Sequence, residues 1–176
     1  MMKNLIMSLM VVAAGLMIGC TTFPKDDIQV DTEANPKINF SGYETYQWLA
    51  EVAVLNDPDG TWEPPAFDAN AEIRYLIDGA LRKRGMSEVS MDPDMYVAYA
   101  AGVDMAALEA RLDEKTNMTM IENVPESGLV VMLIDAQTTA AAWMGVATAD
   151  MKNEKPDIAK KRLEYAINGM FDKLPK

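Results

Sequence analysis

The chain has 176 residues, enough for one folded domain with a single core and too few for two domains of ordinary size. It has no histidine and one cysteine, Cys20, which excludes Ser-His and Cys-His catalytic arrangements, the common metal sites and a disulfide framework. A net charge of −11 disfavours nucleic acid, because an acidic surface repels phosphate. We therefore predict no cofactor, no metal site and no nucleic-acid partner, and we interpret the charge as a source of solubility.

Residues 1–19 have the layout of a secretory signal peptide. Lys3 precedes an uncharged run from Leu5 to Ile18 that is too short and wrongly flanked for a lasting membrane span. The only cysteine follows a small residue at the end of this run. That arrangement resembles the lipobox of bacterial lipoproteins, in which the cysteine is lipidated and becomes the mature N-terminus. The resemblance implies lipidation at Cys20 and a membrane partner through its acyl chains.

Residues 20–36 are predicted to form the lipidated N-terminus and a flexible tether, because they are polar and acidic and include Pro24 and Pro36. In lipoproteins of Gram-negative bacteria, an aspartate after the cysteine marks retention at the inner membrane. The chain has Thr21 at that position, so the resemblance implies the periplasmic side of the outer membrane. Residues 37–176 are predicted to form a single α+β domain.

The first strand is predicted within Ile38–Val54, where Tyr46 and Trp48 alternate with polar residues. The next stretch, Asn56–Pro65, is dense in turn-forming residues and predicts a loop. Two aspartates in it look like a fragment of a calcium loop. The further oxygens and the bidentate glutamate of such a loop are missing, so we predict a plain turn.

A helix is predicted next, capped by Asp68 or Asn70 and ended by a left-handed Gly85. The basic run Arg82–Arg84 falls where the helix dipole favours cations, so we interpret it as structural rather than as a binding patch. Apolar residues recur at helical spacing, at Ile73, Leu76, Ile77, Ala80 and Leu81.

Three further strands follow from the pattern of apolar residues. Met95–Val103 alternates, Leu129–Ile134 is an uninterrupted apolar run typical of a central strand, and Ala140–Thr148 returns as its hairpin partner. Gly145 is expected to make room for a ring from a neighbouring strand. Between Asp104 and Pro125 the pattern weakens: Met105, Leu108 and Leu112 fit a short helix, and Thr116–Ile121 fits a ragged edge strand.

Pro156 suits the first turn of a final helix that runs down to Pro175, with Lys160, Lys161 and Arg162 on its solvated face. Together these elements predict an α+β two-layer sandwich, in which a largely antiparallel sheet of about four strands carries two amphipathic helices on one face. Such helices leave the second apolar face of Leu129–Ile134 uncovered. Either residues 104–125 cover that face, or an envelope protein or a second copy of the chain does.

Two groups of residues invite a functional interpretation. Asp92 and Asp94 are close in sequence, but a hydrolase needs carboxylates opposed across a cleft, whereas acids flanking a proline are typical of a turn cap and a strand entry. Aromatic residues on strands can line a carbohydrate or lipid surface, but alternation turns them inward and favours core packing. These aromatic residues are Tyr46, Trp48, Tyr99 and Trp143.

From about Ile38 to Pro175 the chain resembles the bacterial envelope lipoproteins grouped as domain of unknown function 4136. The resemblance is carried by the order of four motifs, Phe40-x-x-Tyr43-x-Thr45-Tyr46-x-Trp48, Asp92-Pro93-Asp94-x-x-Val97-x-Tyr99, Gly128-Leu129-Val130-Val131 to Asp135, and Trp143-x-Gly145. Met144 departs from the basic residue that the family tends to have there. The resemblance implies an exported, lipid-anchored domain and contributes no catalytic residues.

The sequence thus predicts a non-enzymatic envelope lipoprotein with a binding or structural accessory role. The alternative is a carrier that holds a small hydrophobic or lipid ligand in a pocket between helices and sheet. A hydrolase based on carboxylates is a third interpretation, which the absence of histidine disfavours.

Overall fold

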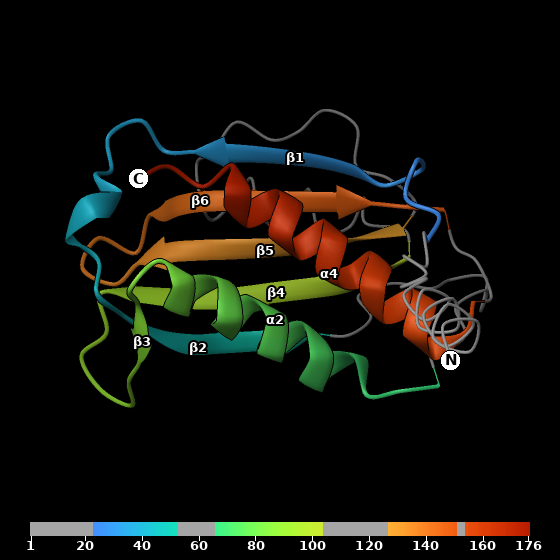
Figure 1. Ribbon diagram of the computed structural model, residues 1–176. Coiled ribbons are helices and arrows are strands. Elements are labelled where there is room, and N and C mark those ends of the chain that lie inside the picture. The colour runs from blue at the N-terminus through green and yellow to red at the C-terminus, as the bar shows by residue number, and fades with distance from the viewer. Residues whose placement is uncertain (1–22, 53–65, 104–126, 151–153) are drawn as a thin grey trace, which may run out of the picture.

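A mixed sheet of six strands carries two helices against one face (Figure 1). The computed structural model describes residues 23–52, 66–103, 127–150 and 154–176. The strands are β1 (Gln29–Ala34), β2 (Thr45–Val52), β3 (Ser87–Glu88), β4 (Met95–Val103), β5 (Ser127–Asp135) and β6 (Ala141–Thr148). The helices are α2 (Ala69–Lys83) and α4 (Pro156–Asp172), and a short 3-10 turn, η2, spans Phe40–Gly42.

The sheet has the order β1-β6-β5-β4-β2-β3. The α+β class and the two helices agree with the prediction, but the sheet has six strands rather than about four. The pairings of β4 with β2 and of β2 with β3 are parallel, so the sheet is mixed. β3 left no signal in the sequence because a strand of two residues is too short to show alternation.

The prediction of a flexible tether over residues 20–36 is wrong for Gln29–Ala34, which form the edge strand β1 and pair with β6 along its whole length. Val30 and Ala34 pack against the core, while Asp31 is exposed. This alternation is present in the sequence, but the acidic residues between the apolar ones conceal it. An edge strand tolerates such charges, because only one of its sides is paired.

The helix boundaries follow the predicted signals. The Asp68 carboxylate accepts a hydrogen bond from the backbone N–H of Ala71 at the start of α2, so Asp68 rather than Asn70 is the cap. Gly85 has φ +86° just after the helix, in the left-handed region that glycine adopts without strain. Pro156 begins α4, as expected.

The core lies between the helices and the sheet, and Trp143 on β6 is its largest fully buried side chain. The indole packs against Phe171 of α4, with ring centroids 5.3 Å apart. A Cβ at Gly145 would lie 2.5 Å from Cη2 of Trp143 and 2.9 Å from the sulfur of Met170. Gly145 does make room for a ring, but the ring comes from two residues earlier on the same strand and not from a neighbouring strand.

The face of the sheet away from the helices is also apolar. Val130, Met144 and Val146 on β5 and β6 are buried there, whereas Leu49 on β2 is 57% exposed. Residues 104–125, which the sequence offers as one cover for this face, lie outside the described residues, as does the loop at 56–65. Within the part of the chain that is described, neither helix has the length and apolar character needed to span a bilayer.

Gly145→Ala should destabilise the domain by about 1–3 kcal/mol, because the new methyl group overlaps the Trp143 ring and the Met170 sulfur in a packed core. Urea unfolding followed by tryptophan fluorescence measures the change. Gly79→Ala is the matched control. Gly79 lies inside α2, and apart from its own turn of helix no atom lies within 4 Å of the place its new methyl group would take. Alanine should therefore leave stability unchanged or raise it by up to about 1 kcal/mol. Equal stability of the two variants would contradict the packing argument.

Candidate functional site

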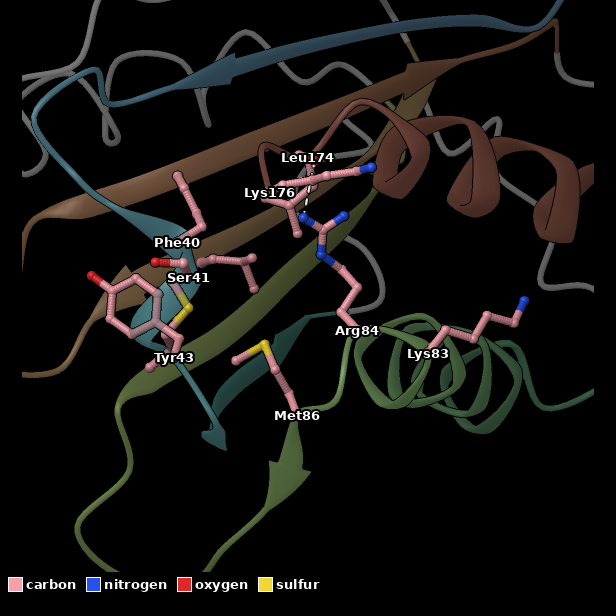
Figure 2. Close-up of a pocket in the computed structure, with 10 residues that line it drawn as sticks. Phe40, Ser41, Tyr43, Lys83, Arg84, Met86, Leu174 and Lys176 are labelled. Carbon is pink, nitrogen blue, oxygen red and sulfur yellow. Dashed lines mark hydrogen bonds between the residues drawn. The ribbon is translucent and has the colours of Figure 1, made fainter.

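A pocket of about 430 Å³ opens at the end of the sheet where β4 begins (Figure 2). Its walls come from η2, from the C-terminal end of α2 and from the last residues of the chain. Four side chains of its apolar lining are each at most 5% exposed, namely Met86, Met95, Leu133 and Leu174. Three cationic side chains also line it, namely Lys83, Arg84 and Lys176.

Arg84 forms the wall between α2 and the C-terminus. Its guanidinium donates to the carbonyl oxygens of Leu174 at 3.0 Å, of Phe171 at 3.5 Å and of Pro175. Burial lowers the pKa of Arg84 from its ordinary value, yet a guanidinium remains charged in proteins. The sequence predicts that the basic run at the end of α2 complements that helix dipole alone. Arg84 in addition holds the carbonyl end of α4, where a cation is also favourable.

The opposite wall is fixed by Tyr43, whose hydroxyl donates to the Asp135 carboxylate at 2.6 Å. Phe40 of η2 packs edge-on against the Tyr43 ring, with centroids 6.0 Å apart. Burial, reinforced by the hydrogen bond to Asp135, raises the pKa of the Tyr43 phenol above its ordinary value. Burial also raises the pKa of Asp135, but hydrogen bonds from Tyr43 and Thr138 outweigh it and leave that pKa low. Tyr43 is therefore a neutral wall of the pocket.

The chemistry of the pocket follows from these side chains. An apolar floor beside lysines on an exposed rim suits a small molecule with a hydrophobic body and an anionic end. Of the described residues that line the pocket, none has a carboxylate side chain, and Ser41 alone has an aliphatic hydroxyl. Elsewhere in the part of the chain that the structure describes, no three acidic, histidine or cysteine side chains gather closely enough to hold a metal ion. The arrangement is suited to binding a ligand.

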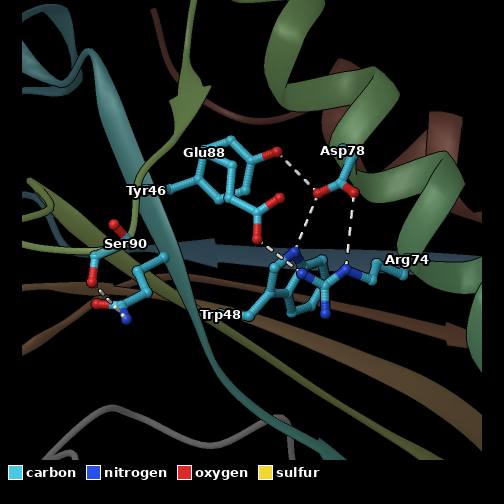
Figure 3. A network of polar contacts seen from close by, with 7 residues as sticks. Tyr46, Trp48, Arg74, Asp78, Glu88 and Ser90 are labelled. Atoms are coloured by element: carbon cyan, nitrogen blue, oxygen red, sulfur yellow. Dashed lines mark hydrogen bonds and ion pairs between the residues drawn. The ribbon is translucent and has the colours of Figure 1, made fainter.

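A second polar cluster joins α2 to β2 and β3 (Figure 3). The Asp78 carboxylate accepts from the Tyr46 hydroxyl at 2.7 Å and from Trp48 Nε1 at 3.0 Å. Arg74 lies over the Trp48 ring at 5.0 Å and pairs with Glu88 at 2.7 Å. Burial, together with the bond to Asp78, raises the pKa of Tyr46. The cluster fixes the helix on the sheet, since each of these polar groups has a protein partner.

The aromatic residues singled out in the sequence lie mostly where alternation places them. Tyr46, Tyr99 and Trp143 are core residues, each at most 3% exposed. Trp48 is half-buried: its ring packs edge-on against the core residue Tyr99, with centroids 6.0 Å apart, and Arg74 also lies over it. Cys20, the predicted lipidation site, lies outside the described residues. The sequence does not reveal the pocket, because its lining residues are spread from Phe40 to Lys176 and share no local pattern.

Asp92 and Asp94 do not act as a pair across a cleft. Asp94 Oδ2 accepts from the backbone N–H groups of Glu44 and Thr45 at 3.0 and 2.8 Å and from the Thr45 hydroxyl at 2.8 Å. The backbone bond from Glu44 and the hydroxyl of Thr45 lower the pKa of Asp94. Asp92 is exposed and has φ 49°, a turn conformation. The predicted turn and strand-entry roles are confirmed.

Comparison with known proteins shows the family to which this chain belongs. Residues 30–176 match the family described as "Domain of unknown function (DUF4136)". The chain belongs to the DUF4136 family. No curated protein matches this DUF4136 chain at a significant level.

Two solved structures align with most of this DUF4136 chain. A DUF4136 family protein from Bacteroides thetaiotaomicron aligns with a TM-score of 0.64 at 11% identity, covering 84% of this chain and 95% of that one. The PelC dodecamer from Paraburkholderia phytofirmans aligns with a TM-score of 0.47 at 12% identity, covering 81% of this chain and 94% of that one. At 11% identity, the likeness to the Bacteroides thetaiotaomicron protein concerns the fold alone.

Asp94→Asn should lower the free energy of unfolding at pH 7 by about 1–2 kcal/mol, because a charged acceptor of three hydrogen bonds becomes neutral. The pKa of Asp94 in the folded state lies below its ordinary value of 3.8, so the ionised group contributes stability that is lost as the pH falls through the folded-state pKa. The difference between wild type and variant should therefore be constant above about pH 5 and shrink below about pH 4. Urea unfolding across this range measures it.

Asp92→Asn is the matched control for this pH series. Asp92 is exposed, and asparagine accepts its positive φ as readily as aspartate does. Its free energy of unfolding should stay within about 0.5 kcal/mol of wild type at neutral pH. A loss at Asp94 that persisted unchanged to pH 3 would show that the carboxylate charge is not the source of the stability.

Proposed function

We propose that this DUF4136 protein is a lipid-anchored envelope lipoprotein, held at the periplasmic side of the outer membrane by acyl chains on Cys20. The observation that supports the anchor is the placement of the only cysteine directly after a signal-like apolar run. Two or more acyl chains, each contributing about 0.8 kcal/mol per buried methylene, make membrane attachment stable where one chain is marginal. Thr21 after the cysteine supports the outer rather than the inner membrane.

The proposed role at the membrane is a non-enzymatic one, in binding or as a structural accessory. It is supported by the way acidic side chains are used in the described residues, where Asp78, Asp94 and Asp135 each accept hydrogen bonds that join elements of the fold. A partner would be an envelope protein or a second copy of the chain. Crosslinking in intact cells, followed by mass spectrometry of the trapped species, distinguishes these two partners.

Cys20→Ser should release the protein from the outer membrane fraction into the soluble periplasm, because serine offers no thiol for acylation. Cell fractionation with immunoblotting measures the distribution. Thr22→Ser is the control, since it makes a small change two residues later and leaves the thiol in place. Retention of the Cys20→Ser variant in the outer membrane fraction, or a wild-type N-terminal peptide of unmodified mass, would refute the anchor.

The pocket supports a second candidate, a carrier of a small amphiphile with an anionic end. Its volume of about 430 Å³ lies in the range of small-molecule sites. Its apolar floor would hold a hydrophobic chain, and the exposed Lys83 and Lys176 would face the anionic group. Arg84 is less suited to this task, since three main-chain carbonyls already occupy its donors.

If this carrier function is correct, the protein binds dodecanoate in calorimetric titrations, and the double variant Lys83→Gln/Lys176→Gln binds it about three- to tenfold more weakly. That range corresponds to two solvent-exposed ion pairs of about 0.3–0.7 kcal/mol each, within the usual range for such pairs. The double variant should bind dodecanol, which has no charge, as well as the wild type does. The difference in dodecanoate affinity should also disappear in high salt, which screens the ion pairs. Lys155→Gln, an exposed lysine outside the pocket, is the control. Absence of dodecanoate binding to the wild type would exclude the carrier.

A further inference from the structure

Arg162 of α4 is buried, although the sequence pattern predicts it on a solvated face with two lysines. It is 7% exposed, the one buried charged residue among those that the structure describes. Its guanidinium donates to both carboxylate oxygens of Asp27, at 2.9 and 2.7 Å, and to the Pro24 carbonyl at 2.6 Å. Its Nε lies 3.3 Å from Glu154 Oε2. One side chain therefore joins the N-terminal segment, the approach to α4 and α4 itself.

Further contacts fix residues 23–28 on the same surface. The Phe23 ring packs edge-on against Tyr165 of α4, with centroids 6.1 Å apart, and Lys25 Nζ lies 5.0 Å from the Tyr165 ring centre. Asp27 also accepts from the backbone N–H of Asp150 at 3.1 Å. The chain is thus attached to the domain from Phe23 onward, before β1 begins. We call residues 23–28 with Arg162 the clamp.

The clamp shortens the link between the domain and Cys20. Four peptide units separate Cys20 from Pro24, so the link spans at most about 14 Å when fully extended. A free tether reaching to Pro36 would instead span up to about 55 Å. An anchor at Cys20 would therefore hold the clamped part of the domain close to the lipid surface.

Strand register shows which end of the domain is held. Thr148 pairs with Gln29 and with Gly128, so β1 begins and β6 ends at the end of the sheet beside the clamp. The pocket lies at the other end, where Met95 pairs with Asp135. Strands of nine residues separate the two ends by about 30 Å. Figure 1 shows η2 and the C-terminus at one end and the start of β1 at the other.

We propose that the clamp orients the domain on the membrane, with the surface formed by Phe23, Lys25 and Tyr165 against the lipid headgroups and the pocket facing away from them. This rests on the proposed acylation of Cys20. Tyr165 is 41% exposed, and an aromatic ring with a neighbouring lysine suits a membrane interface, where the ring meets the acyl boundary and the ammonium meets phosphate. The pocket is then open to the periplasm.

The clamp itself is tested without a membrane, in the soluble Cys20→Ser protein. Arg162→Gln should make tryptic cleavage after Lys25 on the order of tenfold faster, because residues 23–28 lose the ion pair that holds them on α4. Asp27→Asn removes the same pair from the other side and should behave alike. Arg82→Gln, which removes an exposed arginine of α2, is the control. Circular dichroism confirms that each variant is folded, and an unchanged cleavage rate in both clamp variants overturns the proposal.

Orientation is tested with the acylated full-length protein on phosphatidylethanolamine–phosphatidylglycerol vesicles that carry a nitroxide headgroup quencher. Single fluorophores are placed at Lys155→Cys, at the start of α4, and at Gln137→Cys, in the β5–β6 turn beside the pocket end; both positions are exposed. Acylation of Cys20 leaves each introduced thiol unique. Quenching should be at least about threefold stronger at position 155, since the two ends lie about 30 Å apart. In the Arg162→Gln variant, the ratio of quenching at position 155 to quenching at position 137 should fall toward one.

Equal quenching at both positions in the wild type, or stronger quenching at position 137, overturns the orientation. Vesicle flotation and the mass of the N-terminal peptide report acylation separately. If the protein does not float with the vesicles, the proposed anchor is contradicted. If it floats but position 155 is not quenched more strongly than position 137, only the proposed orientation is contradicted.

Discussion

The contact between the Trp143 indole and Gly145 sets the spacing between the sheet and α4. The ring lies over a backbone position that has no side chain, two residues along the same strand, and meets Phe171 from the helix. A packed interior has no room for an added methyl group at this place. Because α4 carries partners for both the pocket and the clamp, its position over β6 determines the geometry of both.

Two arginines attach different parts of the chain to the two halves of α4. Arg84, the C-cap residue of α2, donates to carbonyl oxygens at and beyond the C-terminal end of α4, and so forms a wall of the pocket. Arg162 within α4 binds Asp27 and Pro24, and so holds the segment that precedes β1. A planar guanidinium suits both tasks, since its donors can reach several oxygens at once. The pocket and the N-terminal segment are consequently kept at opposite ends of the domain.

Acidic residues have two uses in this chain. Some remain in solvent and give the chain its net charge of −11. Others connect elements of the fold: Asp78 joins β2 to α2, Asp94 holds the start of β2, and Asp135 holds Tyr43 beside the pocket. Carboxylates accept several hydrogen bonds at once, which makes them effective at such junctions. Sequence alone does not separate the two uses, because neither partner distance nor burial is visible in it.

The sequence by itself determined the local elements, because Asp68, Gly85 and Pro156 act on their immediate neighbours. The apolar repeats of β4 and α2 report one buried face each, and the unbroken apolar run of β5 reports two. Tertiary structure alone decided the rest. The parallel pairing of β2 with β4, the strand β1 and the pocket all depend on residues far apart in the chain. Arg162 shows the reason most directly: a charged residue is predicted to face water unless a partner is known, and Asp27 lies 135 positions away.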